Sequence, residues 1–221
     1  EIVLDNEYWL TGSFALGTGQ GHAEPTSIQI NVRSSAPAAI IATVIAAAVE
    51  ASPALALLRT PLVNTFALYI NGRRRAVANV AASPAADVVD PFLRYQALPH
   101  APAAGDAVIE KLVAREDGEI AIAPSATTTR ITRKVTGRGR LVDASGMTAI
   151  ETWLQLPGMS HFAFRSDEGG GDRAPCGLAL LSAGLAFCYM TQIARYVEAM
   201  KLAVGSVRLV QFSPFQTGAA T

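Results

Sequence analysis

Apolar and polar residues alternate along several stretches of the 221-residue chain, the pattern typical of strands with one buried face. Residues 1–16 and 26–33 alternate in this way, and glycines separate them, which predicts antiparallel strands around a turn. Residues 107–115 fit a short helix or a strand. Further strands are predicted at 62–70, 127–142, 147–156, 161–165 and 204–212, with turns at 71–72 and 143–146.

Two longer stretches have the pattern of helices. The first is predicted from Ser35, as cap, to about Ala51, where Ser52-Pro53 ends it because proline lacks an amide donor. The second is predicted over 178–200 and is mostly apolar. The order of elements predicts an α+β fold of two related halves, at 1–75 and 107–221, joined by a linker at 76–106.

Composition narrows the class of protein. Eighteen basic and eighteen acidic side chains give no net charge, so the positive footprint of a nucleic-acid binder is missing. The basic run at 73–75 is interpreted as a solvated strand end. The longest uncharged apolar runs, 36–49 and 177–193, are shorter than the roughly 20 residues of a membrane span. We expect a soluble protein with neither nucleic acid nor membrane as partner.

The two cysteines also bear on the compartment. Cys176 and Cys188 are twelve positions apart, which is about 18 Å along a helix and beyond the roughly 7 Å limit for a disulfide. This spacing favours a reducing compartment, and we expect a cytoplasmic protein. The sequence opens on Glu1 rather than Met, and we expect that a preceding segment has been removed.

The strongest candidate for chemistry is the segment from 166 to 200. An acidic, glycine-rich turn leads into the second helix, where Cys188 follows the small residues Ser182, Ala183, Gly184 and Ala186. Cys188 is either an inert buried thiol or a nucleophile. Cys176, at the start of the helix, is either an ordinary loop residue or a thiolate favoured by the helix dipole.

Other kinds of site have little support. His22, His100 and His161 are scattered, which predicts no metal site, and we expect no cofactor. The chain has no G-x-S-x-G motif, so a serine hydrolase is not indicated. The glycines at 17, 19 and 21 precede Pro25 rather than a helix, so they predict a hairpin turn and not a dinucleotide loop.

Three segments resemble the OsmC/Ohr proteins, the thiol peroxidases of the osmotically induced and organic-hydroperoxide-resistance type. FRSDEGGGDRAPCGLALLSAGLAFC is similar to the acidic turn and central helix of that family, and VTGRGRLVDASGM is similar to its glycine-arginine hairpin. Residues 30–62 resemble its second long helix. The resemblance covers about two thirds of the chain and implies an OsmC-like fold that acts in the stress response.

The resembling halves come in inverted order. Two explanations fit: a permuted single domain, or the middle of a longer tandem protein, and the second is preferred. A half-domain cannot cover its own sheet. We therefore expect a homodimer or a complex with a companion half-domain chain.

The resemblance also implies a site. Cys188 takes the place of the peroxide-attacking cysteine and Arg138 that of the peroxide-orienting arginine, while the resolving cysteine is replaced by Ser52. The glutamate that holds the arginine in the family is missing, and Glu168 or Asp167 is the candidate replacement. Cys176 of another copy could act as the resolving thiol for Cys188.

Three functions remain open. The first is a thiol-dependent enzyme that reduces organic hydroperoxides, with an apolar or aromatic substrate bound by Glu168, Gly184, Tyr189 and Phe162, although Tyr189 and Phe162 also fit a core. The second is a divergent hydrolase or lyase with a cysteine nucleophile. The third is a noncatalytic binding or scaffolding module.

Overall fold

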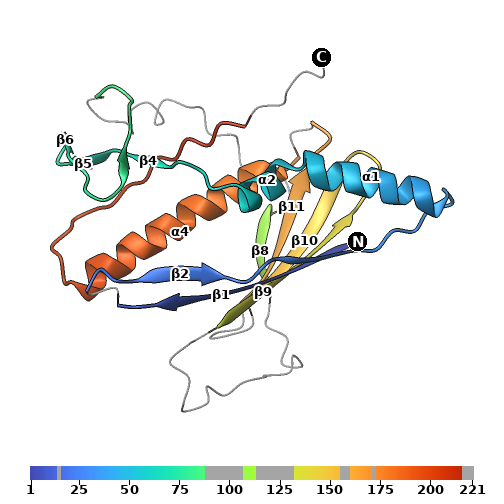
Figure 1. Cartoon of the computed structure of the whole chain (residues 1–221), viewed down its shortest axis with the longest axis horizontal. Coiled ribbons are helices and arrows are strands. Elements are labelled where there is room, and N and C mark those ends of the chain that lie inside the picture. The colour runs from blue at the N-terminus through green and yellow to red at the C-terminus, as the bar shows by residue number, and fades with distance from the viewer. Residues whose placement is uncertain (14–15, 88–106, 113–131, 155–159, 171–172, 216–221) are drawn as a thin grey trace, which may run out of the picture. The chain divides into compact units, whose positions relative to one another are not determined.

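The protein is a mixed α+β protein, as the sequence predicts (Figure 1). The structure, a computed structural model, describes residues 1–13, 16–87, 107–112, 132–154, 160–170 and 173–215. The chain divides into two compact units, which are described separately. Unit 1 comprises residues 1–35 and 105–207, and unit 2 comprises residues 36–104 and 208–221.

Unit 1 contains a seven-stranded sheet and one long helix, α4 (Gly177–Ala199). The sheet has the order β2-β1-β9-β10-β11-β8, and β3 also pairs with β1. Its strands are β1 (Ile2–Thr11), β2 (Gln20–Ala23), β3 (Ser27–Ile30), β8 (Ile109–Leu112), β9 (Arg133–Leu141), β10 (Met147–Leu154) and β11 (Ser160–Asp167).

The centre of the sheet is built from distant parts of the chain. β1 pairs antiparallel with β9, with Val3 opposite Arg138 and Tyr8 opposite Arg133. β9 and β10 form the predicted hairpin, and Gly146 in its turn has a φ of 92°, which favours glycine. Strands β1 to β3 and strands β8 to β11 therefore share one sheet.

The two faces of this sheet differ in character because residues alternate along each strand. On β9, Val135, Gly137 and Gly139 share one face, and Lys134, Thr136 and Arg138 share the other. The register continues the first face to Ile150 on β10 and to Phe164 and Ser166 on β11. One face is thus mostly apolar and the other is charged.

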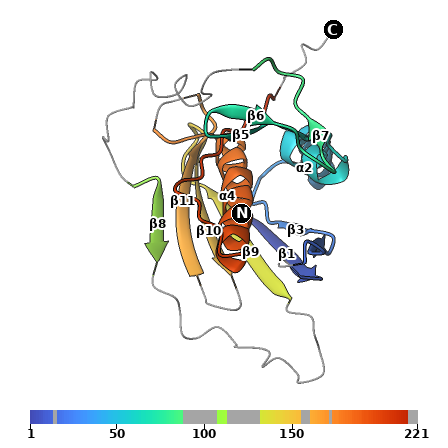
Figure 2. The same cartoon turned by 90° about the vertical axis from the view of Figure 1, so that its left-hand side faces the viewer.

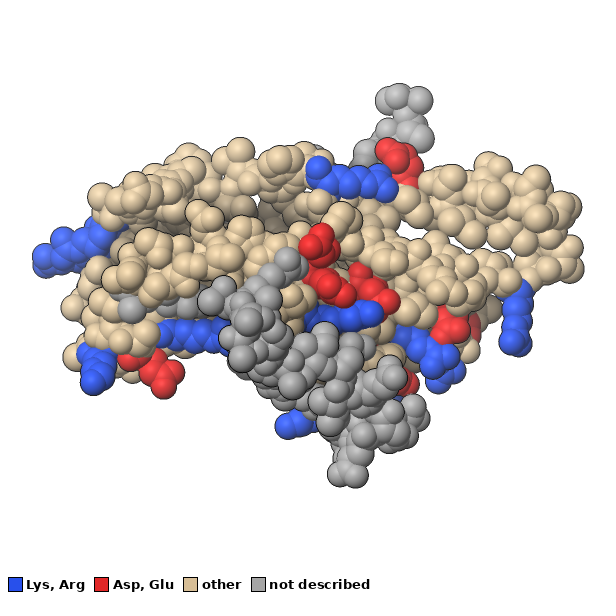
Figure 3. All heavy atoms as spheres, turned by 60° about the horizontal axis from the view of Figure 1, so that its bottom comes forward, with Lys and Arg blue, Asp and Glu red and all other residues tan. Residues whose placement is uncertain are grey.

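Helix α4 lies on the apolar face. Both views place it along one side of the sheet (Figures 1 and 2). At its N-terminus, the Glu168 Oε1 accepts hydrogen bonds from the Gly177 amide at 2.6 Å and from the Ser166 hydroxyl at 2.5 Å. Since Ser166 shares its face with Phe164, α4 starts over the apolar side. Charged side chains of both signs are intermixed on the underside of Figure 1, which Figure 3 turns toward the viewer.

The described residues of unit 2 form the helices α1 and α2 and two small sheets. Helix α1 (Ala38–Ala51) begins after Pro37, which takes the cap position expected for Ser35, because proline at the start needs no amide partner. The Ser52-Pro53 break is confirmed: α2 (Pro53–Arg59) follows at an angle of 63°. The Ser52 hydroxyl caps α2 by accepting a hydrogen bond from the Leu55 amide at 3.3 Å.

The strands of unit 2 are short. β4 (Thr65–Phe66) pairs parallel with β7 (Ala81–Ala82), and β5 (Leu68–Ile70) pairs with β6 (Arg73–Arg75). Asn71 and Gly72 form the β5–β6 turn with φ values of 51° and 75°. The single strand predicted at 62–70 is therefore two strands, and the basic run at 73–75 is a strand.

One predicted strand is wrong. Residues 204–212 alternate like a strand, but they have no regular secondary structure. Residues 107–115, left open between helix and strand, contain β8. His100, most of the predicted linker, and the predicted strand residues 127–131 and 155–156 lie outside the described residues.

Helix α4 is longer than the uncharged run from which it was predicted. It continues past Arg195 to Ala199, so it is long and apolar enough to cross a membrane. The bent pair of α1 and α2, taken together, is also long and apolar enough. This feature was not expected from the run of 17 uncharged residues at 177–193.

Candidate functional site

The Cys188 thiol is exposed. Cys188 lies in the middle of α4, while Cys176 is the N-cap residue of the same helix and is exposed too. Both cysteines are free. Cys188 is therefore not the buried, inert core thiol that was one of its two sequence interpretations.

Apolar side chains around Cys188 are uncovered. Phe187 is 68% exposed and Tyr189 is 40% exposed. A Cβ added at Gly184, one turn before Cys188, would meet no atom within 4 Å. None of the apolar side chains among the described residues is buried. Helix α4 thus presents a thiol and large apolar groups on a surface that the described residues leave open.

Arg138 is not brought to Cys188 within the chain. The register of β9 directs Arg138 to the charged face of the sheet, whereas α4 starts over the apolar face. Arg138 Nε donates to the Glu1 carboxylate. This hydrogen bond and the charge of Glu1 raise the pKa of Arg138 and lower the pKa of Glu1. The arginine is occupied by a local ion pair on the other side of the sheet.

Glu168 holds the helix and not the arginine. Its carboxylate accepts from the first amide of α4, the position where helix N-termini favour an anion. The N-terminal position that would favour a Cys176 thiolate is therefore already filled by a carboxylate. Of the two candidate replacements for the family's arginine-holding acid, Glu168 has become a helix cap.

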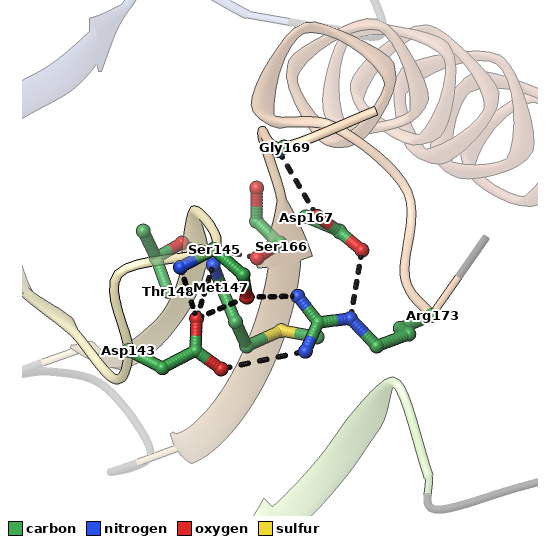
Figure 4. A network of polar contacts seen from close by, with 8 residues as sticks. All are labelled: Asp143, Ser145, Met147, Thr148, Ser166, Asp167, Gly169 and Arg173. Carbon is green, nitrogen blue, oxygen red and sulfur yellow. Dashed lines mark hydrogen bonds and ion pairs between the residues drawn. The ribbon is translucent and has the colours of Figure 1, made fainter. Parts of the chain in front are cut away.

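Asp167 does hold an arginine, but that arginine is Arg173 (Figure 4). Arg173 Nε donates to the Asp167 Oδ2 at 3.1 Å, and the other two guanidinium nitrogens reach the Asp143 Oδ2 at 3.3 Å and the Ser145 Oγ at 2.7 Å. The Asp167 side chain is fully buried. We call Asp143, Ser145, Asp167 and Arg173 the acidic clasp.

Hydrogen bonds in the clasp stabilise the charged forms of both acids. Donation by Arg173, followed by the Gly169 amide, lowers the pKa of Asp167. Donation by the Ser145 hydroxyl, together with the Ser145 and Met147 amides and Arg173, lowers the pKa of Asp143. Both carboxylates are therefore ionised at neutral pH and pair with the guanidinium.

Two glycines bring the clasp together. A Cβ on Gly169 would lie 1.8 Å from the Ser145 carbonyl oxygen, and one on Gly146 would lie 2.7 Å from the Gly169 nitrogen. The Glu168 amide donates to the Gly146 carbonyl at 3.1 Å. The β9–β10 turn and the turn before α4 thus interlock through backbone that only glycine allows.

The residues expected to bind substrate are spread over two elements. Phe162 lies on the apolar face of β11, with its ring centroid 6.4 Å from that of Phe164. Gly184 and Tyr189 lie on α4, and Glu168 caps that helix. The sequence reasoning missed Arg173, although an arginine six positions after a buried-strand aspartate was a usable signal.

Metal ligation has no support in the described part of the chain, where no group of three His, Cys, Asp or Glu residues could hold a metal ion. Comparison with known proteins finds no match: no protein-family model, no curated protein and no solved structure matches the sequence.

Proposed function

We propose that the chain is a thiol-dependent enzyme with an OsmC-like fold, in which Cys188 is the nucleophile and an organic hydroperoxide or a related electrophile is the substrate. The observation that carries this proposal is the exposed Cys188 thiol on a helix with uncovered apolar neighbours. An apolar or aromatic hydroperoxide would bind beside the thiol through contacts with side chains such as Tyr189.

The proposed reaction needs a cation beside the thiolate and a thiol as reductant. The thiolate attacks one peroxide oxygen, the O–O bond breaks and the alcohol leaves with a proton, so Cys188 becomes a sulfenic acid that a thiol must reduce. Arg138 faces the other side of the sheet from α4, so a different cation must assist the thiolate, and in this proposal a partner supplies it, either another copy or a companion chain. The uncovered α4 surface is where such a partner would pack.

A peroxide-consumption assay with a dithiol reductant tests the proposal. We expect turnover of cumene hydroperoxide by the native chain and none by Cys188→Ser. Cys176→Ser is the matched control, because it removes the other exposed thiol, and retained activity would show that turnover with the dithiol does not require Cys176. Absence of turnover together with ester hydrolysis that requires Cys188 would instead support the hydrolase alternative.

A noncatalytic module is the second candidate, and one observation favours it. Ser52 stands where the resemblance implies a resolving cysteine, and its hydroxyl already caps α2. If Cys188 in the native chain is alkylated no faster than a free thiol and no peroxide is consumed, the module that has lost its redox pair is the better description.

A further inference from the structure

We infer that the charged face of the sheet binds a small tetrahedral oxyanion of the phosphate type, in a hollow beside Arg140. The hollow has a volume of about 140 Å³ and is lined by Arg138, Arg140, Ala149 and Glu151. It lies on the face opposite the start of α4, so this inference does not depend on the proposed thiol chemistry.

The strand register creates the hollow. Arg138 and Arg140 are two positions apart on β9, so they share a face at a spacing of about 7 Å. Arg140 is paired with Ala149 on β10, and Ala149 is paired in turn with Arg165 on β11. A methyl group between two arginines leaves a space that a longer side chain would fill.

Arg140 is available to a ligand. Arg138 already pairs with Glu1, whereas Arg140 is exposed and makes no hydrogen bond or ion pair with any described residue. A guanidinium fork matches the oxygens of phosphate and carboxylate groups in bidentate geometry. Arg138 uses its Nε for Glu1, and its terminal nitrogens make no further hydrogen bond with a described residue. A tetrahedral anion has oxygens for Arg140 and for these nitrogens, while a carboxylate is satisfied by one guanidinium.

Size and charge limit the ligand. At about 140 Å³, the hollow has room for a group the size of phosphate. Glu151 stands on the rim, where it also contacts His161 Nε2 at 3.3 Å. Its negative charge disfavours a polyanion and leaves a single small anion as the fitting ligand.

The test is an amide chemical-shift titration of the full chain with inorganic phosphate, at ionic strength held constant with sodium chloride. We expect saturable shifts at Arg140 and Ala149. The Arg140→Gln variant loses one charge-assisted hydrogen bond, so it should bind phosphate about tenfold more weakly than the native chain. Arg195→Gln, which removes an exposed arginine on α4, is the matched control and should bind as the native chain does. A parallel titration with phenyl phosphate separates a free anion from a phosphoester as the preferred source.

Two further variants separate a built site from general charge attraction. Ala149→Leu fills the hollow without changing charge and should abolish the saturable shifts, and Glu151→Gln removes the rim carboxylate and should tighten binding. The inference is overturned if neither phosphate nor phenyl phosphate gives saturable shifts. It is equally overturned if Arg140→Gln and Arg195→Gln bind alike.

Discussion

The acidic clasp and the surface of α4 differ in how completely this chain covers them. In the clasp, Asp167 is buried, and so is Ser166 beside it, and the polar groups of both have partners within the chain. On α4, large apolar side chains such as Phe187 remain exposed. A globular domain with a complete hydrophobic core shows the reverse, with apolar residues buried and charged residues exposed. Among the described residues, the chain therefore buries a polar junction, whereas the apolar surface of α4 stays uncovered.

The largest expected effect comes from filling the interlocked backbone of the clasp. Gly169→Ala places a Cβ against the Ser145 carbonyl, so the two turns must separate, and we expect the free energy of unfolding to fall by about 3 kcal/mol. Gly170→Ala is the control: its φ of 75° costs about 1 kcal/mol, but nothing lies within 4 Å of the added methyl. Urea unfolding of both variants measures the difference, and equal losses would mean that the turns are not interlocked.

The second prediction tests whether the clasp stabilises the fold because Asp167 is buried. Arg173→Ala leaves the buried Asp167 without its cation, so stability should fall clearly. Arg59→Ala is a matched control, because both arginines are 49% exposed, but the partner of Arg59 is Glu50, which is 84% exposed. Thermal melting should show a larger shift for Arg173→Ala. A larger shift for Arg59→Ala would contradict the clasp.

The third prediction concerns acid. In the folded chain, the pKa values of Asp167 and Asp143 are lower than their ordinary values near 4. As the pH falls below about 4, the unfolded chain therefore binds more protons than the folded chain. The stabilisation is present above about pH 4 and is lost as the pH falls through the lowered folded values. Melting temperatures from pH 6 downward should drop more steeply for the native chain than for Arg173→Ala, in which the lowering is relieved. Parallel curves would show that these acids are not coupled to folding.

The smallest effect addresses the open surface of α4. Gly184→Ala removes a flexible residue from a helix interior, where no atom crowds the new methyl, so it should stabilise the isolated chain by about 1 kcal/mol. If a partner packs closely at Gly184, the same variant should weaken association. Sedimentation and urea unfolding, measured together, sharpen the comparison. A stabilised chain whose association is unchanged would place the partner elsewhere.

Local signals made most of the fold predictable. The β9–β10 hairpin, the break at Ser52-Pro53, the Asn71-Gly72 turn and the long cysteine helix all follow from turn residues and periodicity within a few positions. The predicted strand at 204–212 failed because alternation does not supply a neighbouring strand to pair with.

The site was less predictable because its contacts are not local. Arg173 meets Asp143 across 30 positions, a pairing that no spacing rule gives. The face of the strand on which Arg138 lies could be predicted. In VTGRGR, glycines alternate with Arg138 and Arg140, which assigns both arginines to one face. The sequence does not predict which face of the sheet α4 covers, because that depends on the contact between Ser166 and Glu168 at the start of the helix.

The pairing of β1 with β9 has a consequence for synthesis. The Thr136 hydroxyl donates to the Asp5 carboxylate at 2.5 Å, a contact that spans 131 positions of the chain. During synthesis β1 is made well before β9, so the edge of β1 that pairs with β9 has no partner until residues 133–141 have been made. Proteins dominated by such long-range pairing fold slowly and are prone to aggregate while they wait. We therefore expect nascent chains that end before residue 133 to depend on chaperones for solubility.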